Sequence, residues 1–503
     1  MGRLGRLALL TLLLACGPAG AQVKPPAAGD AGPDKSSPPP DKPADKFAAP
    51  PPPTPPDASP APPPRPAPQR RAAPNAPPQA TPAPPPANEP PAVARLRALL
   101  GPETTLTYRS AESLDPARGS VRLLGVSMDG RGRRVAMEEL TLDGLRDDGV
   151  AEATARAVSM RDRRNNATVA RLRLAGLSVQ RPPPGAEFRP DMVRLDALRI
   201  EGLRMTGESD ATVADFSVED YGAGRVGRVS LAGFDMRVPR SGNRVAAARA
   251  ALRGMDLAAG LTALVASQAP PRTPGTYGLE IEGVSVRQGA RTLGGFGALR
   301  AAGELPASGP ETGSLVLRDL RIEPFPGFAE WLRRFGYEAV TADLSGESRF
   351  DAATGRLELT SVSLAGREMG ALGLSVVLDG VAPRSGGPRS ADFANARIVS
   401  AALRYVDQSL YGRYVRQQAR ETRAPEEQVR KEQAENADLM LGMLGNGPGL
   451  DAVREAVTRF LRGEAREVEI TARPAEPLPI NEFGPTPPDA ALLGRLGLGA
   501  TAK

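Results

Sequence analysis

The sequence predicts a mainly β protein with a helical C-terminal part, in which two related modules of curved antiparallel sheet follow a disordered, proline-rich segment. Three observations support this fold class: an apolar/polar alternation that recurs along most of the chain, a helical stretch near its end, and a sharp rise in proline content between residues 22 and 91. Side chains of a strand point to opposite faces with a period of two, so the alternation indicates strands.

Residues 1–21 have the pattern of an export signal, in which two arginines precede a short apolar run. The run is shorter than the about 20 apolar residues that a membrane-spanning helix needs. Two cleavage sites compete. One is a small-x-small site that ends at residue 21; the other is a lipobox-like Leu-Leu-Ala-Cys segment, in which residues 1–15 are the signal and Cys16 carries a lipid anchor. Both alternatives predict an exported bacterial protein, either periplasmic or anchored to a membrane as a lipoprotein.

Residues 22–91 form a segment of biased composition, in which 28 of the 70 residues are proline. Such a segment has too few apolar side chains to offset the entropy lost on ordering, so it is expected to be disordered and biased to polyproline II. We interpret it as a linker, and with lipidation at Cys16 it would act as a tether.

One pattern recurs between residues 121 and 286: two apolar residues in alternation, a glycine, and two further apolar residues in the opposite phase. A change of phase implies an extra residue in the ladder, as in a β-bulge, and glycine supplies the backbone freedom for it. We therefore expect bent strands whose two arms direct their apolar side chains toward one concave interior. The glycines of this pattern are Gly125, Gly144, Gly176, Gly202, Gly233, Gly254 and Gly283, with partial copies at Gly366 and Gly380.

A coarser symmetry divides the chain into two modules, residues 92–311 and 312–473. Near the start of each, a short amphipathic helix ends at a glycine, a strand follows, and a D-x-A-x-G turn leads into a second strand. The two turns begin at Asp115 and Asp351.

The second module carries a predicted helical insertion, about residues 406–461. Pro425 followed by two glutamates is typical of a helix start, and residues 453–461 contain an apolar stripe with helical spacing. A strand is expected over residues 468–472, and residues 474–503 are predicted to be a proline-rich tail with a short helix. We expect the helices to cap one end of the sheet.

The composition excludes several kinds of chemistry. The chain has no histidine and one cysteine, so it has no catalytic triad, no histidine-ligated metal and no internal disulfide. No Gly-Lys-Ser or Gly-Lys-Thr occurs, which excludes a phosphate-binding loop. We therefore predict no catalytic residues, no cofactor and no metal site.

Two motifs invite a catalytic or cofactor-binding interpretation. Residues 222–227 match GxGxxG, but a strand follows them instead of a helix, so a glycine-rich hairpin is favoured. Asp115 and Asp351 could form the carboxylate pair of a glycan hydrolase. An aspartate before a turn usually accepts hydrogen bonds from its own backbone, which favours the structural interpretation.

Charge is nearly balanced, with 64 basic and 58 acidic residues. Many arginines fall on the polar phase of the predicted strands, and a self-paired, solvated face is the preferred interpretation, with an anionic envelope ligand as the alternative. Nucleic acid is not expected as a partner. Examples of these arginines are Arg122, Arg171, Arg173, Arg199 and Arg204.

The glycine-centred units and the D-x-A-x-G turns resemble the repeats of AsmA-like bacterial envelope proteins, over about residues 92–380. The resemblance implies a curved sheet whose apolar groove carries lipid between bacterial membranes. The chain differs from that family in its missing N-terminal transmembrane anchor, its long proline-rich leader and its helical C-terminal part.

These observations predict a non-enzymatic, exported cell-envelope protein that binds a lipid or another envelope component on a concave apolar β-surface. Membrane contact is expected only through the anchor at Cys16. The alternatives are an interaction scaffold tethered by the linker, with an envelope protein as partner, and a carboxylate-dependent glycan hydrolase. Candidates for lining the groove, which could instead form a closed core, are the apolar residues just after the repeat glycines: Val126, Met128, Leu177, Val179, Leu203, Met205, Phe234, Met236, Val284 and Val286.

Overall fold

The structure is a computed structural model that describes residues 89–503, with short gaps at 131, 162–164, 181–187, 208, 239–240, 267, 269–270, 272, 384–390 and 484–489. The predicted signal, the anchor at Cys16 and almost all of the linker lie outside the described residues.

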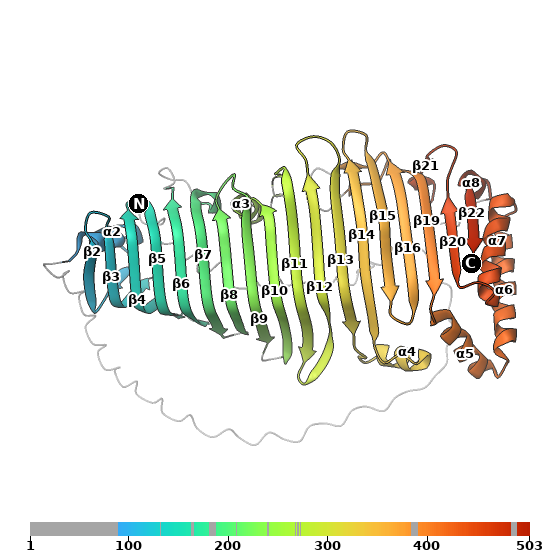
Figure 1. Ribbon diagram of the computed structural model, residues 1–503, viewed down its shortest axis with the longest axis horizontal. Helices are drawn as coiled ribbons and strands as arrows, with labels where there is room; N and C mark the ends of the chain where they lie inside the picture. The colour runs from blue at the N-terminus through green and yellow to red at the C-terminus, as the bar shows by residue number, and fades with distance from the viewer. Residues whose placement is uncertain are drawn as a thin grey trace, which may run out of the picture. The chain divides into compact units, whose positions relative to one another are not determined.

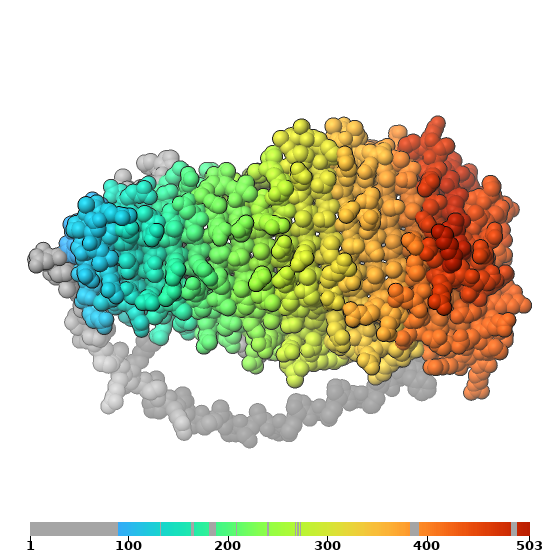
Figure 2. Space-filling view, viewed as in Figure 1, coloured from blue at the N-terminus to red at the C-terminus, as the bar shows by residue number. Residues whose placement is uncertain are grey.

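The described chain forms one curved antiparallel sheet of 20 strands with a helical C-terminal part, which confirms the predicted fold class (Figure 1). From β3 to β16 each strand pairs with the next one along the chain, and β16 then pairs with β19. The colour therefore changes steadily along the surface in Figure 2. These strands are β3 (Ser120–Gly130), β4 (Arg133–Arg146), β5 (Gly149–Arg161), β6 (Asn166–Val179), β7 (Val193–Thr206), β8 (Asp210–Tyr221), β9 (Gly227–Val238), β10 (Asn243–Met255), β11 (Gly275–Gln288), β12 (Arg291–Leu305), β13 (Glu311–Ile322), β14 (Val340–Asp351), β15 (Arg356–Gly366), β16 (Gly370–Asp379) and β19 (Arg397–Asp407).

Short strands complete the two ends of the sheet. β1 (Thr105–Thr107) and β2 (Ser110–Asp115) both pair with β3. At the other end β20 (Glu467–Ala472) and β21 (Leu478–Pro479) both pair with β19, and β22 (Leu498–Ala502) pairs with β20. A separate two-stranded ladder joins β17 (Ala382–Pro383) and β18 (Ala391–Asp392).

The repeat glycines have positive φ angles, as at Gly125 (60°), Gly202 (67°) and Gly283 (63°), and the buried residues change phase there as predicted. The inserted residue that we expected is wrong at these three positions, because the strand register continues without a shift across each of them. The partner strand changes phase at the facing position instead. At these positions the phase change is therefore a crease, a line along which neighbouring strands bend together. At Gly254 the register does shift, as expected for an inserted residue.

Two creases cross the sheet perpendicular to its strands. Each strand from β4 to β10 meets both, and the two meeting points are six residues apart, as at Ala170 and Gly176 in β6 or Asp196 and Gly202 in β7. The second meeting point has a positive φ in every one of these strands. At two of these points the residue is not glycine: Ala157 (φ 48°) in β5 and Asp220 (φ 55°) in β8. Farther along, Asp319 in β13 also has a positive φ (52°).

The facing residue explains why glycine is used at most of these points. A Cβ added to Gly233, which has φ +63°, would lie 2.8 Å from the Cβ of Ala214 on the neighbouring strand. An L side chain there would thus meet both backbone strain and a steric clash. The creases need a small residue with access to the left-handed region, and the facing alanine lets two strands approach closely.

The helices lie at the ends and edges of the sheet. α2 (Pro91–Leu100) buries Val93 and Leu96 and contacts β3 and β4, while α3 (Leu257–Val265) follows β10. α4 (Phe328–Phe335) ends at Gly336 in the left-handed conformation, as predicted for the start of the second module. Two 3-10 turns, η1 (Pro190–Met192) and η2 (Ile480–Glu482), complete the connections.

The predicted boundary between the two modules, at residues 311 and 312, lies at the start of β13. β13 pairs with β12 on one side and with β14 on the other, so hydrogen bonding continues across the boundary. The two modules are parts of one sheet.

The predicted helical insertion at residues 406–461 consists of α5 (Leu410–Thr422), α6 (Glu426–Met443) and α7 (Pro448–Arg462). α6 begins after Pro425, as expected, and α7 buries Val453, Ala456 and Phe460 from the predicted stripe. α7 contacts α6, β20 and β22, so the helices pack at the C-terminal end of the sheet. The tail contains the expected short helix, α8 (Ala490–Arg495), but its final strand β22 was not predicted.

Candidate ligand-binding face

One face of the sheet carries the apolar side chains of every long strand, and we call it the inner face. Residues that pair directly across antiparallel strands lie on the same face, so the register defines rows of neighbours across the sheet. The first row of β11–β20 is apolar throughout, and a second row lies two residues away from it. The first row is Ile281, Leu299, Leu317, Leu344, Leu364, Leu372, Tyr405 and Val468, and the second includes Leu279, Ala301, Leu315, Val362, Leu374, Leu403 and Ile470.

Burial of the inner face changes along the sheet. In β3–β8 its side chains form a closed core, as at Leu123 (0% exposed) and Ile200 (1%). In the described residues of β9–β13 no apolar side chain is buried to that degree. The inner face is therefore closed near the N-terminal end of the sheet and open farther along.

The ten groove candidates divide between these two regions. Val126, Met128, Leu177 and Leu203 are buried in the closed core, where a ligand would have no access. The other six are partly exposed: Val179 in β6, Met205 in β7, Phe234 and Met236 in β9, and Val284 and Val286 in β11.

The most exposed part of the inner face lies in β13–β19, and the sequence analysis did not single it out. Five leucines there leave more than a third of their surface in contact with solvent: Leu315 (39%), Leu364 (46%), Leu372 (41%), Leu374 (37%) and Leu403 (43%). Leu364 pairs with Leu372, and Leu374 pairs with Leu403, so these four leucines adjoin one another, whereas β14 lies between them and Leu315. The only sequence signal was the partial repeat that ends at Gly366.

The opposite, outer face is polar, and many of its arginines pair with a carboxylate of a neighbouring strand. Arg122 and Glu139 are 2.7 Å apart, Arg199 and Asp215 are 2.8 Å apart, and Arg171 lies 3.9 Å from a glutamate of the next strand. Exposed pairs of this kind contribute at most about 1 kcal/mol each. The self-paired interpretation is thus correct for these three arginines, whereas Arg173 and Arg204 are exposed and have no ion pair within the described chain.

A shallow groove of about 730 Å³ follows the outer side of one crease over β3–β7. Small residues such as Gly125, Ala157 and Ala170 form its floor. Its charged walls neutralise one another, since Arg156 lies 3.5 Å from Glu139. The groove is therefore polar and nearly neutral, which suits neither a strongly charged ligand nor an apolar one.

The proposed carboxylate pair does not come together. Asp115 and Asp351 each accept hydrogen bonds from the backbone of their own turn, from the N–H groups of Ala117 and Ala353. Strands β3–β13 lie between β2 and β14. At about 4.8 Å per step the two strands are roughly 60 Å apart along the sheet, far beyond the about 10 Å limit of a glycosidase pair.

The GxGxxG segment is the turn between β8 and β9, so the predicted hairpin is confirmed. Gly224 donates its backbone N–H to Asp256, the residue that also caps the N-terminus of α3. Within the described residues no group of three or more potential ligands could hold a metal ion.

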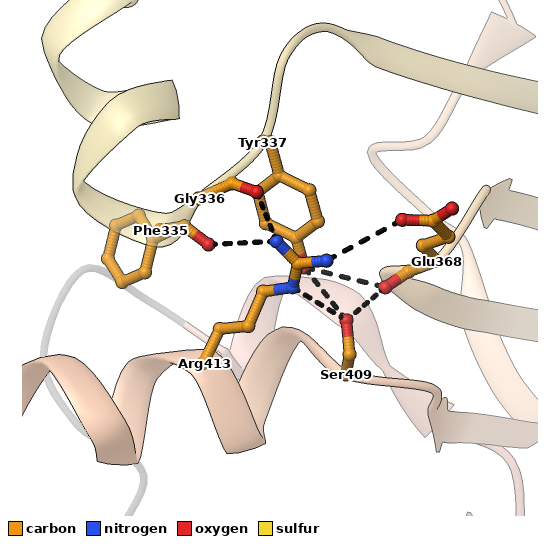
Figure 3. Close-up of polar contacts among 6 residues, drawn as sticks. All are labelled: Phe335, Gly336, Tyr337, Glu368, Ser409 and Arg413. Carbon is orange, nitrogen blue, oxygen red and sulfur yellow. Dashed lines mark hydrogen bonds and ion pairs between the residues drawn. The ribbon is translucent and has the colours of Figure 1, made fainter.

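A cluster of polar contacts centred on Arg413, the Arg413 node, connects α4 and α5 beside the open region (Figure 3). Arg413 of α5 donates to the carbonyl oxygens of Phe335 (3.2 Å) and Gly336, and to Ser409 Oγ (3.1 Å). Its guanidinium lies 4.1 Å from the centre of the Tyr337 ring and 3.5 Å from Glu368. The arginine thus joins the end of α4, the β15–β16 turn and the start of α5.

The tyrosines of the sheet are structural. Burial, with smaller contributions from Asp191 and Asp256, raises the pKa of Tyr221 to about 12, and its hydroxyl donates to the Pro190 carbonyl oxygen. Burial also raises the pKa of Tyr405, whose hydroxyl donates to Asp407 at 2.9 Å. Both phenols stay protonated at neutral pH and supply no general base.

Comparison with known proteins gives one match. Residues 363–503, from β15 to the end of the chain, match a protein family described as "Uncharacterized protein". No curated protein and no solved structure matches the chain. Among the described helices none is both long and apolar enough to cross a membrane.

Proposed function

We propose that this chain is a non-enzymatic, exported cell-envelope protein that holds a lipid by its acyl chains against the open inner face of β11–β19. The observation that carries the proposal is the patch of four adjoining, half-exposed leucines on β15, β16 and β19, with Leu315 of β13 exposed two strands away from β15. Monomeric proteins rarely leave a contiguous apolar patch open to water unless it binds an apolar partner.

The geometry of the patch supports an elongated apolar ligand. The rows of inner-face residues run across the strands, at about 4.8 Å per strand, so the seven strands from β11 to β19 offer an apolar path of roughly 30 Å. The path ends at β19, where Phe460 of α7 packs against Tyr405. Burial of each methylene of an acyl chain contributes about 0.8 kcal/mol. A path of this length can accommodate the full acyl chain of a phospholipid.

The test uses the full chain purified from a bacterial membrane or periplasmic fraction. Native mass spectrometry should show the protein with bound lipid, and a photoreactive diazirine fatty acid should cross-link to peptides of β13–β19. The double variant Leu364→Glu/Leu403→Glu places charges in the path and should reduce cross-linking about tenfold or more.

The matched control is Leu114→Glu, which changes an exposed leucine (51%) in β2, outside the open region. It should cross-link like the unmodified chain. Purely ligand-free masses, or cross-links spread evenly over the sheet, would contradict the proposal.

The scaffold alternative has one observation in its favour. α6 exposes Leu439 (65%), Met440 (64%) and Met443 (72%) near its C-terminal end. Chemical cross-linking in cells that traps one protein partner through these residues, with no bound lipid, would favour the scaffold.

A further inference from the structure

α4 and α5 form a second surface at one end of strands β13–β19, and we call it the α4–α5 surface. The register places the two helices at the same sheet edge, since α4 joins the paired ends of β13 and β14, and α5 follows the end of β19. The helices contact each other, and both lie along the lower edge of the sheet in Figure 1.

Aromatic rings form a stack on and beside α4. The ring centres of Phe325 and Phe328 are 5.2 Å apart, and those of Phe328 and Trp331 are 5.5 Å apart. Phe325 and Trp331 are nevertheless 43% and 38% exposed. Exposed aromatic rings of this kind are typical of the interface between membrane and water.

The same two helices carry exposed arginines. Arg333 of α4 and Arg416, Arg420 and Arg423 at α5 are exposed, and within the described chain none of them has an ion pair. This differs from arginines of the outer face such as Arg122 and Arg199, which lie beside a carboxylate of a neighbouring strand. Residues 410–423 contain four arginines and one glutamate, a net charge of +3, half of the +6 of the whole chain.

The α4–α5 surface is held rigidly. Arg334 pairs with Glu421, and the Arg413 node ties the end of α4 to the start of α5 (Figure 3). Beneath the rings, Leu332 and Met369 form a buried cluster against which Val340, the first residue of β14, packs. The exposed rings are therefore continuous with the end of the inner face.

We propose that the α4–α5 surface docks on a lipid bilayer with anionic headgroups. Phe325 and Trp331 would enter the interface, and Arg333, Arg416, Arg420 and Arg423 would bind lipid phosphates, since guanidinium groups pair well with phosphate. Rings and unpaired cations that lie together along two fixed helices suit an extended anionic surface. This inference goes beyond the proposed function, because it assigns a membrane contact to residues outside the inner face.

Trp331 is the only tryptophan of the chain and reports on docking directly. The full chain is mixed with vesicles of equimolar phosphatidylglycerol and phosphatidylcholine, or with vesicles of phosphatidylcholine alone. The anionic vesicles should bind the protein, shift the Trp331 emission to shorter wavelength and allow quenching by brominated lipid. Raising the salt concentration should weaken binding.

The variant Arg416→Gln/Arg420→Gln/Arg423→Gln should bind the anionic vesicles on the order of a hundredfold more weakly, at about fivefold for each arginine near a membrane surface. Phe325→Ser should reduce binding several-fold and keeps the tryptophan reporter. The matched control is Arg173→Gln/Arg204→Gln/Arg237→Gln, which removes the same charge from exposed positions on β6, β7 and β9. It should change vesicle binding less than about twofold, apart from the general effect of net charge.

An equal loss in the control variant would overturn the proposal, because net charge alone would then explain binding. A Trp331 emission that does not change when vesicles bind would also overturn it, as would tighter binding to an acidic polypeptide such as polyglutamate than to the vesicles. Fatty-acid cross-linking in vesicle-free solution tests the inner face separately. If the chain does not bind vesicles but still cross-links to the fatty acid, only the docking proposal fails. If the chain binds vesicles but does not cross-link to the fatty acid, only the proposed lipid site fails.

Discussion

The inner face is closed in β3–β8 and largely open in β11–β19, where Leu378 of β16 is a buried exception (6% exposed), although both regions carry the same apolar pattern. The two regions differ in their creases. Both creases cross every strand from β4 to β10, and one of them ends where Gly254 of β10 faces Tyr277 of β11. We infer that two creases fold the sheet onto itself, whereas the region with one crease stays open.

The largest expected effect separates the two regions by stability. Leu123→Ala in the closed region should lower the free energy of unfolding by about 2–5 kcal/mol, because it leaves a cavity around a fully buried side chain. The matched change Leu364→Ala in the open region should cost about 1 kcal/mol or less, since 46% of that side chain is already exposed. Urea denaturation of both variants measures the difference.

Equal losses for the two variants would contradict the comparison and would show that the open region is covered in solution. Adding a fatty acid tests the same comparison through ligand stabilisation. Bound lipid should stabilise the unmodified chain and should stabilise the Leu123→Ala variant by a similar amount, because the ligand contacts only the open region.

The second prediction concerns the creases. Gly233→Ala should destabilise the chain by about 2–3 kcal/mol, since the new Cβ meets both left-handed backbone strain and the Cβ of Ala214 at 2.8 Å. Gly289→Ala is the control, because Gly289 has a similar φ of +59° but open space around it. It should cost only about 1 kcal/mol, from the backbone strain alone.

Thermal unfolding of the two variants gives this difference. If Gly233→Ala costs no more than Gly289→Ala, then close approach of the strands does not hold the crease. In that case the closed region would depend on core packing instead of on the creases.

The sequence predicted much of the fold because its signals are local. The alternation of residues 121–286 identified the strands, the glycines identified the phase changes, and Pro425 marked the start of α6. The facing positions, such as Ala214 and Asp196, were not predicted, because an alanine or an aspartate in a strand has no distinctive local pattern. The register that places them opposite glycine is a property of two strands at once.

The candidate site was harder to predict than the fold. Leu203 is buried and Leu374 is 37% exposed, yet both belong to similar apolar strands. Whether such a residue lines a core or an open face depends on the number of creases and on neighbours many residues away. The aromatic and arginine side chains of the α4–α5 surface come together for the same reason, since α4 and α5 are separated by more than 70 residues.

The smallest expected effect uses the raised pKa of Tyr221 in the closed region. Burial raises this pKa to about 12, whereas the phenol of an unfolded chain ionises near about pH 10. The unfolded chain therefore releases the proton first, so this tyrosine's contribution to stability is complete below about pH 10 and is lost as the pH rises toward 12. Tyr221→Phe should make the fall in unfolding free energy over that range shallower. Urea denaturation of both chains at several pH values measures how steeply the unfolding free energy falls with pH. Equal slopes would mean that the phenol of Tyr221 is open to water. Closure of the inner face would then not extend to the end of β8.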